Sequence, residues 1–91
     1  MARIFLTHRV RDYAEWRKGY DADAERRSGA GLSDVGHYHS ADYPNQFLIV
    51  WDSEHSVEDT EAMLNGMMSD PDLARLMEEA GVLEKPGFWV G

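Results

Sequence analysis

The chain has 91 residues, of which 43% are hydrophobic, and 17 acidic against 9 basic side chains give it a formal net charge of −8. A chain of this length forms one domain, so we expect a single unit over residues 1–91. The acidic balance argues against nucleic acid and against anionic membranes as partners, because both attract basic surfaces. The absence of cysteine excludes disulfides, thiolate nucleophiles and cysteine-ligated metals.

The amino-terminal residues do not resemble an export signal, because Met1-Ala2-Arg3 leads directly into β-prone sequence without a long apolar stretch. The longest strongly apolar run, residues 47–51, is far too short to span a bilayer. We therefore expect a cytoplasmic protein that does not insert into membranes.

A strand followed closely by a helix is predicted for the first third of the chain. Residues 3–10 alternate in polarity, so the even-numbered side chains, His8 among them, share one face of a strand. Asp12 is a typical helix cap, and Glu15 stands three residues later, where it can bond back to the backbone of the cap. We expect one continuous helix over residues 13–28.

Two more strands are predicted in the middle of the chain. Residues 34–40 form the first of them, and Val35, His37 and His39 share one of its faces. An Asp-Tyr-Pro-Asn turn signal separates this strand from residues 46–52. The latter segment is apolar at nearly every position, which is typical of a strand buried on both faces.

The last third of the chain predicts two short helices and a final strand. Ser56 can cap the first helix, and Met67 lies on its expected buried face. Asp70 followed by proline is the pattern that starts a second helix, and Gly81 ends it. Residues 88–90 are the predicted strand.

These elements follow the order β-α-β-β-α-(α)-β, which is typical of the ferredoxin-like, split βαβ fold of the α+β class. We expect a four-stranded antiparallel sheet in the order 4-1-3-2, with all helices on one face. The helices then leave the other face of residues 46–52 uncovered, although its side chains are apolar. A second copy of the chain is the simplest cover, so we predict a homodimer that packs through this sheet face.

Three motifs in the chain resemble a known family. They are His8-x-Val10-x-Asp12-Tyr13-x-x-Trp16, then Asp42-x-Pro44-Asn45 before a strand ending in Trp51-Asp52-Ser53, and Ser69-Asp70-Pro71-Asp72-Leu73 leading to Ala80-Gly81-Val82. Together they resemble the small dimeric α/β-barrel proteins grouped with the antibiotic-biosynthesis monooxygenases. The resemblance implies the fold and the dimer. It does not imply one reaction, since that superfamily includes cofactor-independent oxygenases, polyketide cyclases and haem-degrading enzymes. The Asn-Trp-His set of the haem-degrading members has no clear counterpart here.

Three histidines are the candidate catalytic residues. His8 lies on a predicted central strand and can act as a general base, because imidazole titrates near neutral pH; the alternative is a packing role at the edge of the core. His37 and His39 can converge on one ligand as a proton-shuttling pair, or belong to the polar face of an edge strand. The same pair is also half of a typical zinc site, but His8 lies on the order of 10 Å away, across an intervening strand.

A set of large side chains is the candidate substrate-binding wall. It consists of Tyr13, Trp16, Tyr20, Trp51 and Met67. Aromatic rings suit a planar ligand, and methionine adapts to an irregular apolar one. The alternative for each of them is a place in the hydrophobic core.

Two functions from different classes follow. The first is a cofactor-independent monooxygenase or cyclase, in which a histidine abstracts a proton from an aromatic or polyketide-like substrate. The sequence requires no cofactor and no metal for this chemistry. The second is a non-catalytic module that binds a small apolar ligand or serves for dimerisation. A cavity lined by the histidines favours the enzyme, whereas a cavity filled by the aromatic rings favours the second function.

Overall fold

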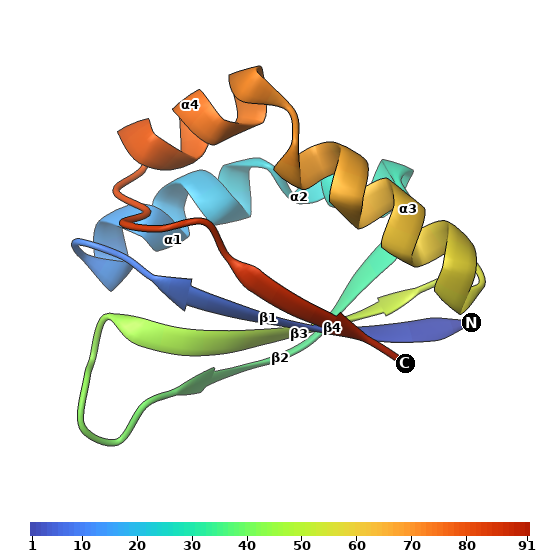
Figure 1. Ribbon diagram of the computed structural model, residues 1–91. Helices are drawn as coiled ribbons and strands as arrows, with labels where there is room; N and C mark the ends of the chain where they lie inside the picture. The colour runs from blue at the N-terminus through green and yellow to red at the C-terminus, as the bar shows by residue number, and fades with distance from the viewer.

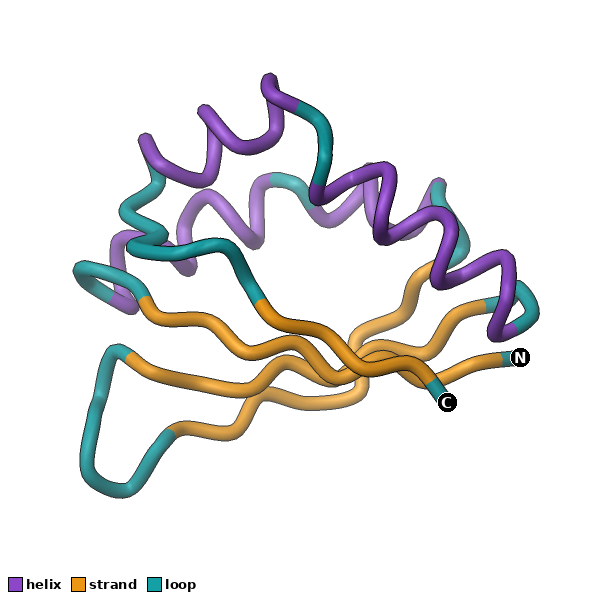
Figure 2. Tube along the Cα trace, viewed as in Figure 1, coloured by secondary structure: helices purple, strands orange, loops and turns teal.

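The chain folds into a sheet with helices on one of its faces (Figure 1). The computed structural model describes residues 1–91. Its strands are β1 (Ala2–Arg9), β2 (Leu32–His39), β3 (Gln46–Ser53) and β4 (Gly87–Val90). They form an antiparallel sheet in the order β2-β3-β1-β4, as expected. The helices are α1 (Tyr13–Ala22), α2 (Ala24–Gly29), α3 (Val57–Met68) and α4 (Pro71–Glu79), and all lie over the same face of the sheet (Figure 2). The predicted ferredoxin-like fold is confirmed.

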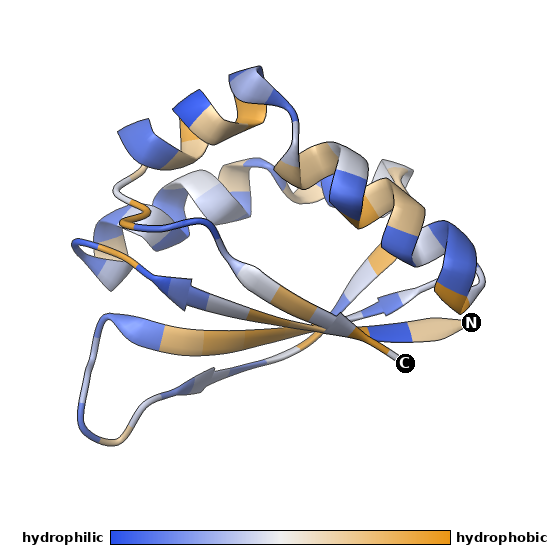
Figure 3. Cartoon of the chain, in the orientation of Figure 1, coloured by the Kyte–Doolittle hydropathy of each residue, from blue (hydrophilic) through white to orange (hydrophobic).

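The hydrophobic core lies between the two central strands and the helices. Ile4 and Leu6 on β1, Ile49 on β3 and Leu64 on α3 are almost completely buried. Figure 3 shows the hydrophobic residues that follow the middle of the sheet. None of the helices is long and apolar enough to cross a membrane.

The predicted helix caps are present. The side chain of Asp12 accepts hydrogen bonds from the backbone N–H groups at the start of α1, Ser56 does so at the start of α3, and Asp70 at the start of α4. These caps satisfy donors that the first turn of a helix leaves unpaired. Glu15, by contrast, pairs with Arg11 at 3.5 Å and not with the backbone of the cap.

The single helix expected over residues 13–28 is wrong, because the chain breaks at Asp23 into α1 and α2. The carbonyl oxygen of Tyr20 accepts hydrogen bonds from the Asp23 N–H at 3.2 Å and from Nη1 of Arg27 at 2.7 Å. The oxygen is thus committed to a tight turn and to a side chain, and the regular helical ladder stops there. Because of the break, the Arg27 side chain of α2 contacts Tyr20 of α1.

The expectation that Val35, His37 and His39 share one face is wrong for Val35. The register between β2 and β3 shifts between Asp34 and Gly36, which is a β-bulge. As a result Asp34 pairs with Trp51 on the helix-covered face, while Val35 stays 43% exposed. The bulge therefore brings a carboxylate under α1.

The junction between α3 and β3 generates a prediction about stability. Thr60 and Ser53 are buried, and their hydroxyl oxygens lie 2.8 Å apart. Thr60→Val keeps the shape of the side chain but removes one partner, so we expect the free energy of unfolding to fall by about 1–2 kcal/mol in urea denaturation. The matched control is Thr7→Val on the outer face of β1, for which we expect a change under about 0.5 kcal/mol. Equal losses in both variants would contradict this view of the junction.

Candidate functional site

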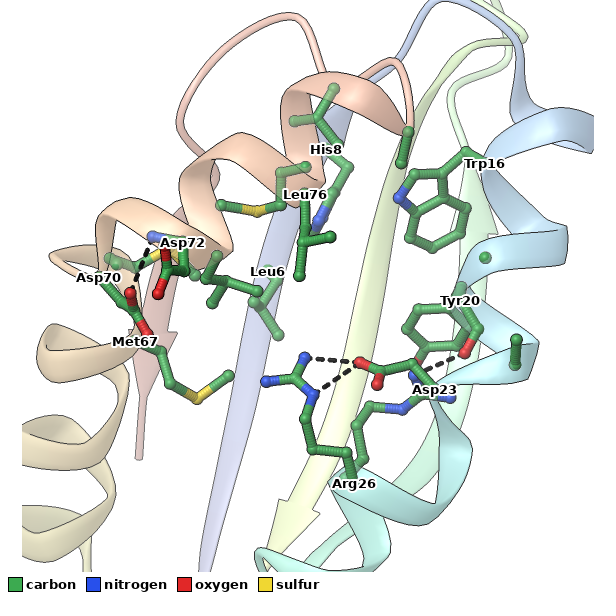
Figure 4. A pocket seen from close by; sticks show the side chains of 18 of the residues that line it. Leu6, His8, Trp16, Tyr20, Asp23, Arg26, Met67, Asp70, Asp72 and Leu76 are labelled. Atoms are coloured by element: carbon green, nitrogen blue, oxygen red, sulfur yellow. Dashed lines mark hydrogen bonds and ion pairs between the residues drawn. The ribbon is translucent and has the colours of Figure 1, made fainter.

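A cavity of about 500 Å³ lies between the sheet and the helices. Leu6 and His8 of β1 and Trp51 of β3 line it from the sheet, and Trp16 and Tyr20 of α1 line one side. Met67 at the end of α3 and the apolar side of α4 line the opposite side (Figure 4). A volume of this size suits a small organic molecule.

The outer wall of the cavity is α4, the helix farthest from the sheet (Figure 1). Its Leu73, Leu76 and Met77 line the cavity, yet no residue of α4 is buried and Leu76 is 59% exposed. An apolar group that enters between these side chains and the sheet removes apolar surface from water, which lowers the free energy. The cavity is consequently a place where a hydrophobic ligand would be stabilised.

His8 is a buried polar group in the cavity wall. It is 8% exposed and packs between Phe47, whose ring is stacked with the imidazole at 5.3 Å, and Trp16 at 5.4 Å. Its Nδ1 is buried without a hydrogen-bond partner. Burial, and secondly the nearby charge of His37, lower the pKa of His8 to about 4. The imidazole is therefore neutral at physiological pH.

Trp16, Tyr20 and Trp51 form the aromatic wall of the cavity. The rings of Trp16 and Tyr20 stack with centroids 4.7 Å apart. The Tyr20 hydroxyl donates a hydrogen bond to Asp34, and Nε1 of Trp51 donates to the Tyr20 oxygen at 2.7 Å and to Asp34 at 3.1 Å. Burial and then the hydrogen bond to Asp34 raise the pKa of Tyr20, so the phenol stays protonated and neutral.

Arg27 supports the aromatic wall from behind. The side chain is buried, and its guanidinium carbon lies 3.5 Å from the centre of the Tyr20 ring. A buried cation requires a partner, and Asp34 provides one, with a carboxylate oxygen 3.7 Å from Nη2. His37 Nε2 is also 3.7 Å from Asp34, and Nδ1 lies 3.2 Å from Arg17. Burial and the charge of Arg17 lower the pKa of His37.

The cavity collects most, but not all, of the residues singled out in the sequence. Five of these residues line the cavity: His8, Trp16, Tyr20, Trp51 and Met67. The other three, Tyr13, His37 and His39, do not line it. Tyr13 instead meets His39 edge-on, with ring centroids 4.4 Å apart. Of the three imidazoles, only that of His8 therefore lines this cavity. No group of three or more His, Asp or Glu side chains is arranged to hold a metal ion.

Sequence reasoning missed Asp34 and Arg27, the two charged groups that fix the aromatic wall. One signal for Asp34 was present, because a glycine inside a strand pattern, here Gly36, often marks a bulge. No comparable signal distinguishes Arg27 from its neighbour Arg26. Both are arginines in the last turn of α2, yet Arg27 is buried and Arg26 forms a half-exposed ion pair with Asp23 at 2.6 Å.

No protein-family model and no curated protein matches the sequence. Solved structures do match over nearly the whole chain. A protein from Bordetella bronchiseptica that carries the name of an antibiotic biosynthesis monooxygenase aligns with a TM-score of 0.72 and 15% identity, over 99% of this chain and 93% of its own. Protein Atu4242 from Agrobacterium tumefaciens aligns with a TM-score of 0.61 and 19% identity, over 100% and 91%.

A NIPSNAP-like domain protein from Burkholderia xenovorans also aligns, with a TM-score of 0.63 and 10% identity over 98% of this chain and 81% of its own. Identities this low establish a shared fold and no shared reaction. The chain thus has the fold of the antibiotic biosynthesis monooxygenase-like proteins, as its motifs indicated.

The buried neutral imidazole of His8 predicts a pH dependence of stability. The pKa of His8 falls from 6.5 to about 4 on folding, so the unfolded chain binds a proton more readily than the folded one. The contribution of His8 to stability is complete above pH 6.5 and is lost as the pH falls towards 4.

Between pH 7 and pH 5 this loss amounts to about 2 kcal/mol of unfolding free energy. Urea denaturation measures the fall in unfolding free energy from pH 7 to pH 5, and in His8→Leu this fall should be smaller by that amount than in the wild type. Identical declines in the two proteins would contradict the assignment of a neutral buried imidazole.

Proposed function

We propose that this protein binds a planar, apolar molecule in the cavity between sheet and helices and oxidises it with O₂ without a cofactor. The observation that supports this proposal is a buried imidazole without a hydrogen-bond partner in the wall of a largely apolar cavity that aromatic rings line. A buried polar atom is costly to leave unpaired, so a site that retains one is arranged for a partner that arrives with the ligand.

The proposed chemistry begins with proton transfer to His8. A substrate with a methylene group beside a conjugated carbonyl gives up a proton to the imidazole and becomes an enolate. The enolate transfers electrons to O₂; one oxygen atom replaces the two methylene hydrogens as a carbonyl, and the other leaves as water (R₂CH₂ + O₂ → R₂C=O + H₂O). O₂ is the oxidant and the substrate carbanion the reductant, so the balance requires no further reagent. In a cyclase, the same enolate would attack a carbonyl of its own molecule.

The low pKa of His8 restricts the substrate. An imidazole with a pKa of about 4 is a weak base, so it deprotonates only a group that is itself acidic. Extended aromatic ketones meet this condition because their enolates are aromatic phenolates. Trp16 and Tyr20 offer flat surfaces to such a molecule.

A glycine in the cavity wall provides a test. Gly19 of α1 lines the cavity and has no atom within 4 Å of an added Cβ, so the backbone there accepts a side chain, and Gly19→Leu would place an apolar group in the cavity. With anthrone as the probe, we expect the wild-type protein to accelerate O₂ uptake and anthraquinone formation. Gly19→Leu should lower that rate at least about tenfold, since the cavity would be blocked. Gly66→Leu on α3, equally free of contacts and outside the cavity wall, is the matched control. Equal rates for both variants would refute the cavity as the site.

A non-catalytic binding role is the second candidate, and the weak basicity of His8 favours it. In that case His8 only hydrogen-bonds the ligand, and anthrone would bind without any consumption of O₂ above the uncatalysed rate. Gly19→Leu would then abolish binding. The assignment to the cytoplasm stays a prediction from the sequence in either case.

We also propose that the protein works as a homodimer joined through the uncovered face of the sheet. This face carries large exposed rings: Phe5 is 39%, Tyr38 58% and Trp89 60% exposed. Phe5 and Trp89 pair across β1 and β4, and Phe5 also pairs with Val50 on β3. A continuous apolar patch on a sheet without covering helices is typical of a protein–protein interface.

A charge placed in this patch tests the dimer. In Trp89→Glu each copy would bury an unpaired carboxylate in the interface, so we expect the variant to be monomeric at concentrations where the wild type is dimeric. Light scattering coupled to size exclusion reports the mass directly. Leu83→Glu is the control, because Leu83 is similarly exposed at 55% but lies outside the sheet. A monomeric wild type would refute the dimer.

A further inference from the structure

Two ring nitrogens in the cavity wall lack partners within the chain. One belongs to His8, whose imidazole makes no hydrogen bond although the side chain is 8% exposed. The other is the indole N–H of Trp16, which points towards His8 across the cavity in Figure 4. The two rings are neighbours, with centroids 5.4 Å apart. The indole N–H of Trp51, by contrast, is fully occupied by Tyr20 and Asp34.

The charged groups around the cavity are all paired. Arg26 forms an ion pair with Asp23 at 2.6 Å, and Arg27 is committed to Asp34 and to the Tyr20 carbonyl oxygen. On the opposite side, Asp72 pairs with Arg75 at 3.2 Å, while Asp70 accepts the cap hydrogen bond of α4. No free cation is left to neutralise an anionic ligand, and the chain as a whole carries a charge of −8. A carboxylate or phosphate would lose its hydration in this cavity without compensation.

We propose that the ligand is an uncharged aromatic molecule with a hydroxyl group, and that His8 and Trp16 hold this hydroxyl between them. The inference rests on the ligand-binding function proposed above for the same cavity. The indole N–H donates to the hydroxyl oxygen, and the hydroxyl donates to the lone pair of the neutral imidazole. A hydroxyl is the smallest group that does both, because it is a donor and an acceptor at one atom.

The arrangement also accounts for discrimination between similar ligands. An ether at the same place accepts from Trp16 but leaves the imidazole lone pair of His8 buried and unpaired. Sites built to hydrogen-bond a hydroxyl reject analogues that lack it for this reason. Trp16 and His8 would thus hydrogen-bond the hydroxyl group of the ligand. Its apolar rings would contact Tyr20, Met67 and Leu76.

The test compares 2-naphthol with 2-methoxynaphthalene and 2-naphthoate, which differ only at the polar group. Two-dimensional NMR of ¹⁵N-tryptophan-labelled protein resolves the three indole N–H signals, and Trp16→Phe assigns one of them. We expect 2-naphthol to move the Trp16 signal downfield and to leave the signal of Trp89, on the outer sheet face, unchanged. Its affinity should exceed that of each of the other two probes about tenfold.

Variants separate the inference from the function on which it rests. In His8→Leu the preference for 2-naphthol over 2-methoxynaphthalene should disappear, and in His55→Leu, at an exposed histidine away from the cavity, it should persist. Equal binding of the two neutral probes to the wild type, with binding lost in Gly19→Leu, would overturn the inference and leave the ligand-binding function intact. Binding that Gly19→Leu does not affect, or no binding of any probe, would overturn both. The Trp16 signal of the wild type decides the matter even if His8→Leu fails to fold.

Discussion

The carboxylate of Asp34 is the interaction on which the geometry of the cavity depends. It accepts hydrogen bonds from the Tyr20 hydroxyl and the Trp51 indole, and it balances the buried charge of Arg27. These partners come from α1, β3 and α2, so one side chain of β2 joins the edge of the sheet to both helices above it. Removal of the carboxylate would leave the buried guanidinium of Arg27 without an anionic partner and the Tyr20 hydroxyl without its acceptor, which is more costly than the loss of one exposed ion pair.

The empty volume follows from how this network fixes the aromatic rings. Tyr20 cannot turn into the cavity, because its hydroxyl is bound on the side of Asp34 and its ring lies against Arg27. Trp16 is stacked on Tyr20 and is fixed with it. The apolar side chains of α4 approach from the other side without reaching close packing, since none of them is buried. A rigid wall and an incompletely packed helix leave the cavity between them, with His8 at its inner surface.

The sequence was informative about patterns that are local, and less so about the contacts that shape the site. Alternation on β1 placed His8 on the covered face, and helical spacing placed Trp16 and Tyr20 together, as the structure shows. The capping residues marked the helix starts because a cap acts within three residues. The break at Asp23 and the bulge at β2 depend on contacts between distant segments. Local periodicity therefore could not reveal that Asp34 faces α1 or that His37 is turned away from the cavity towards Arg17.

The central claim is that the space between the aromatic wall and α4 receives an apolar ring. The most direct measurement is the set of intermolecular nuclear Overhauser effects between bound 2-naphthol and the methyl groups of the protein. The account predicts cross-peaks to Met67, Leu76 and Met77, which line the cavity. Cross-peaks confined to Leu48 and Val50 would contradict it, because those side chains alternate with Phe47, Ile49 and Trp51 along β3 and belong to the opposite face of the sheet.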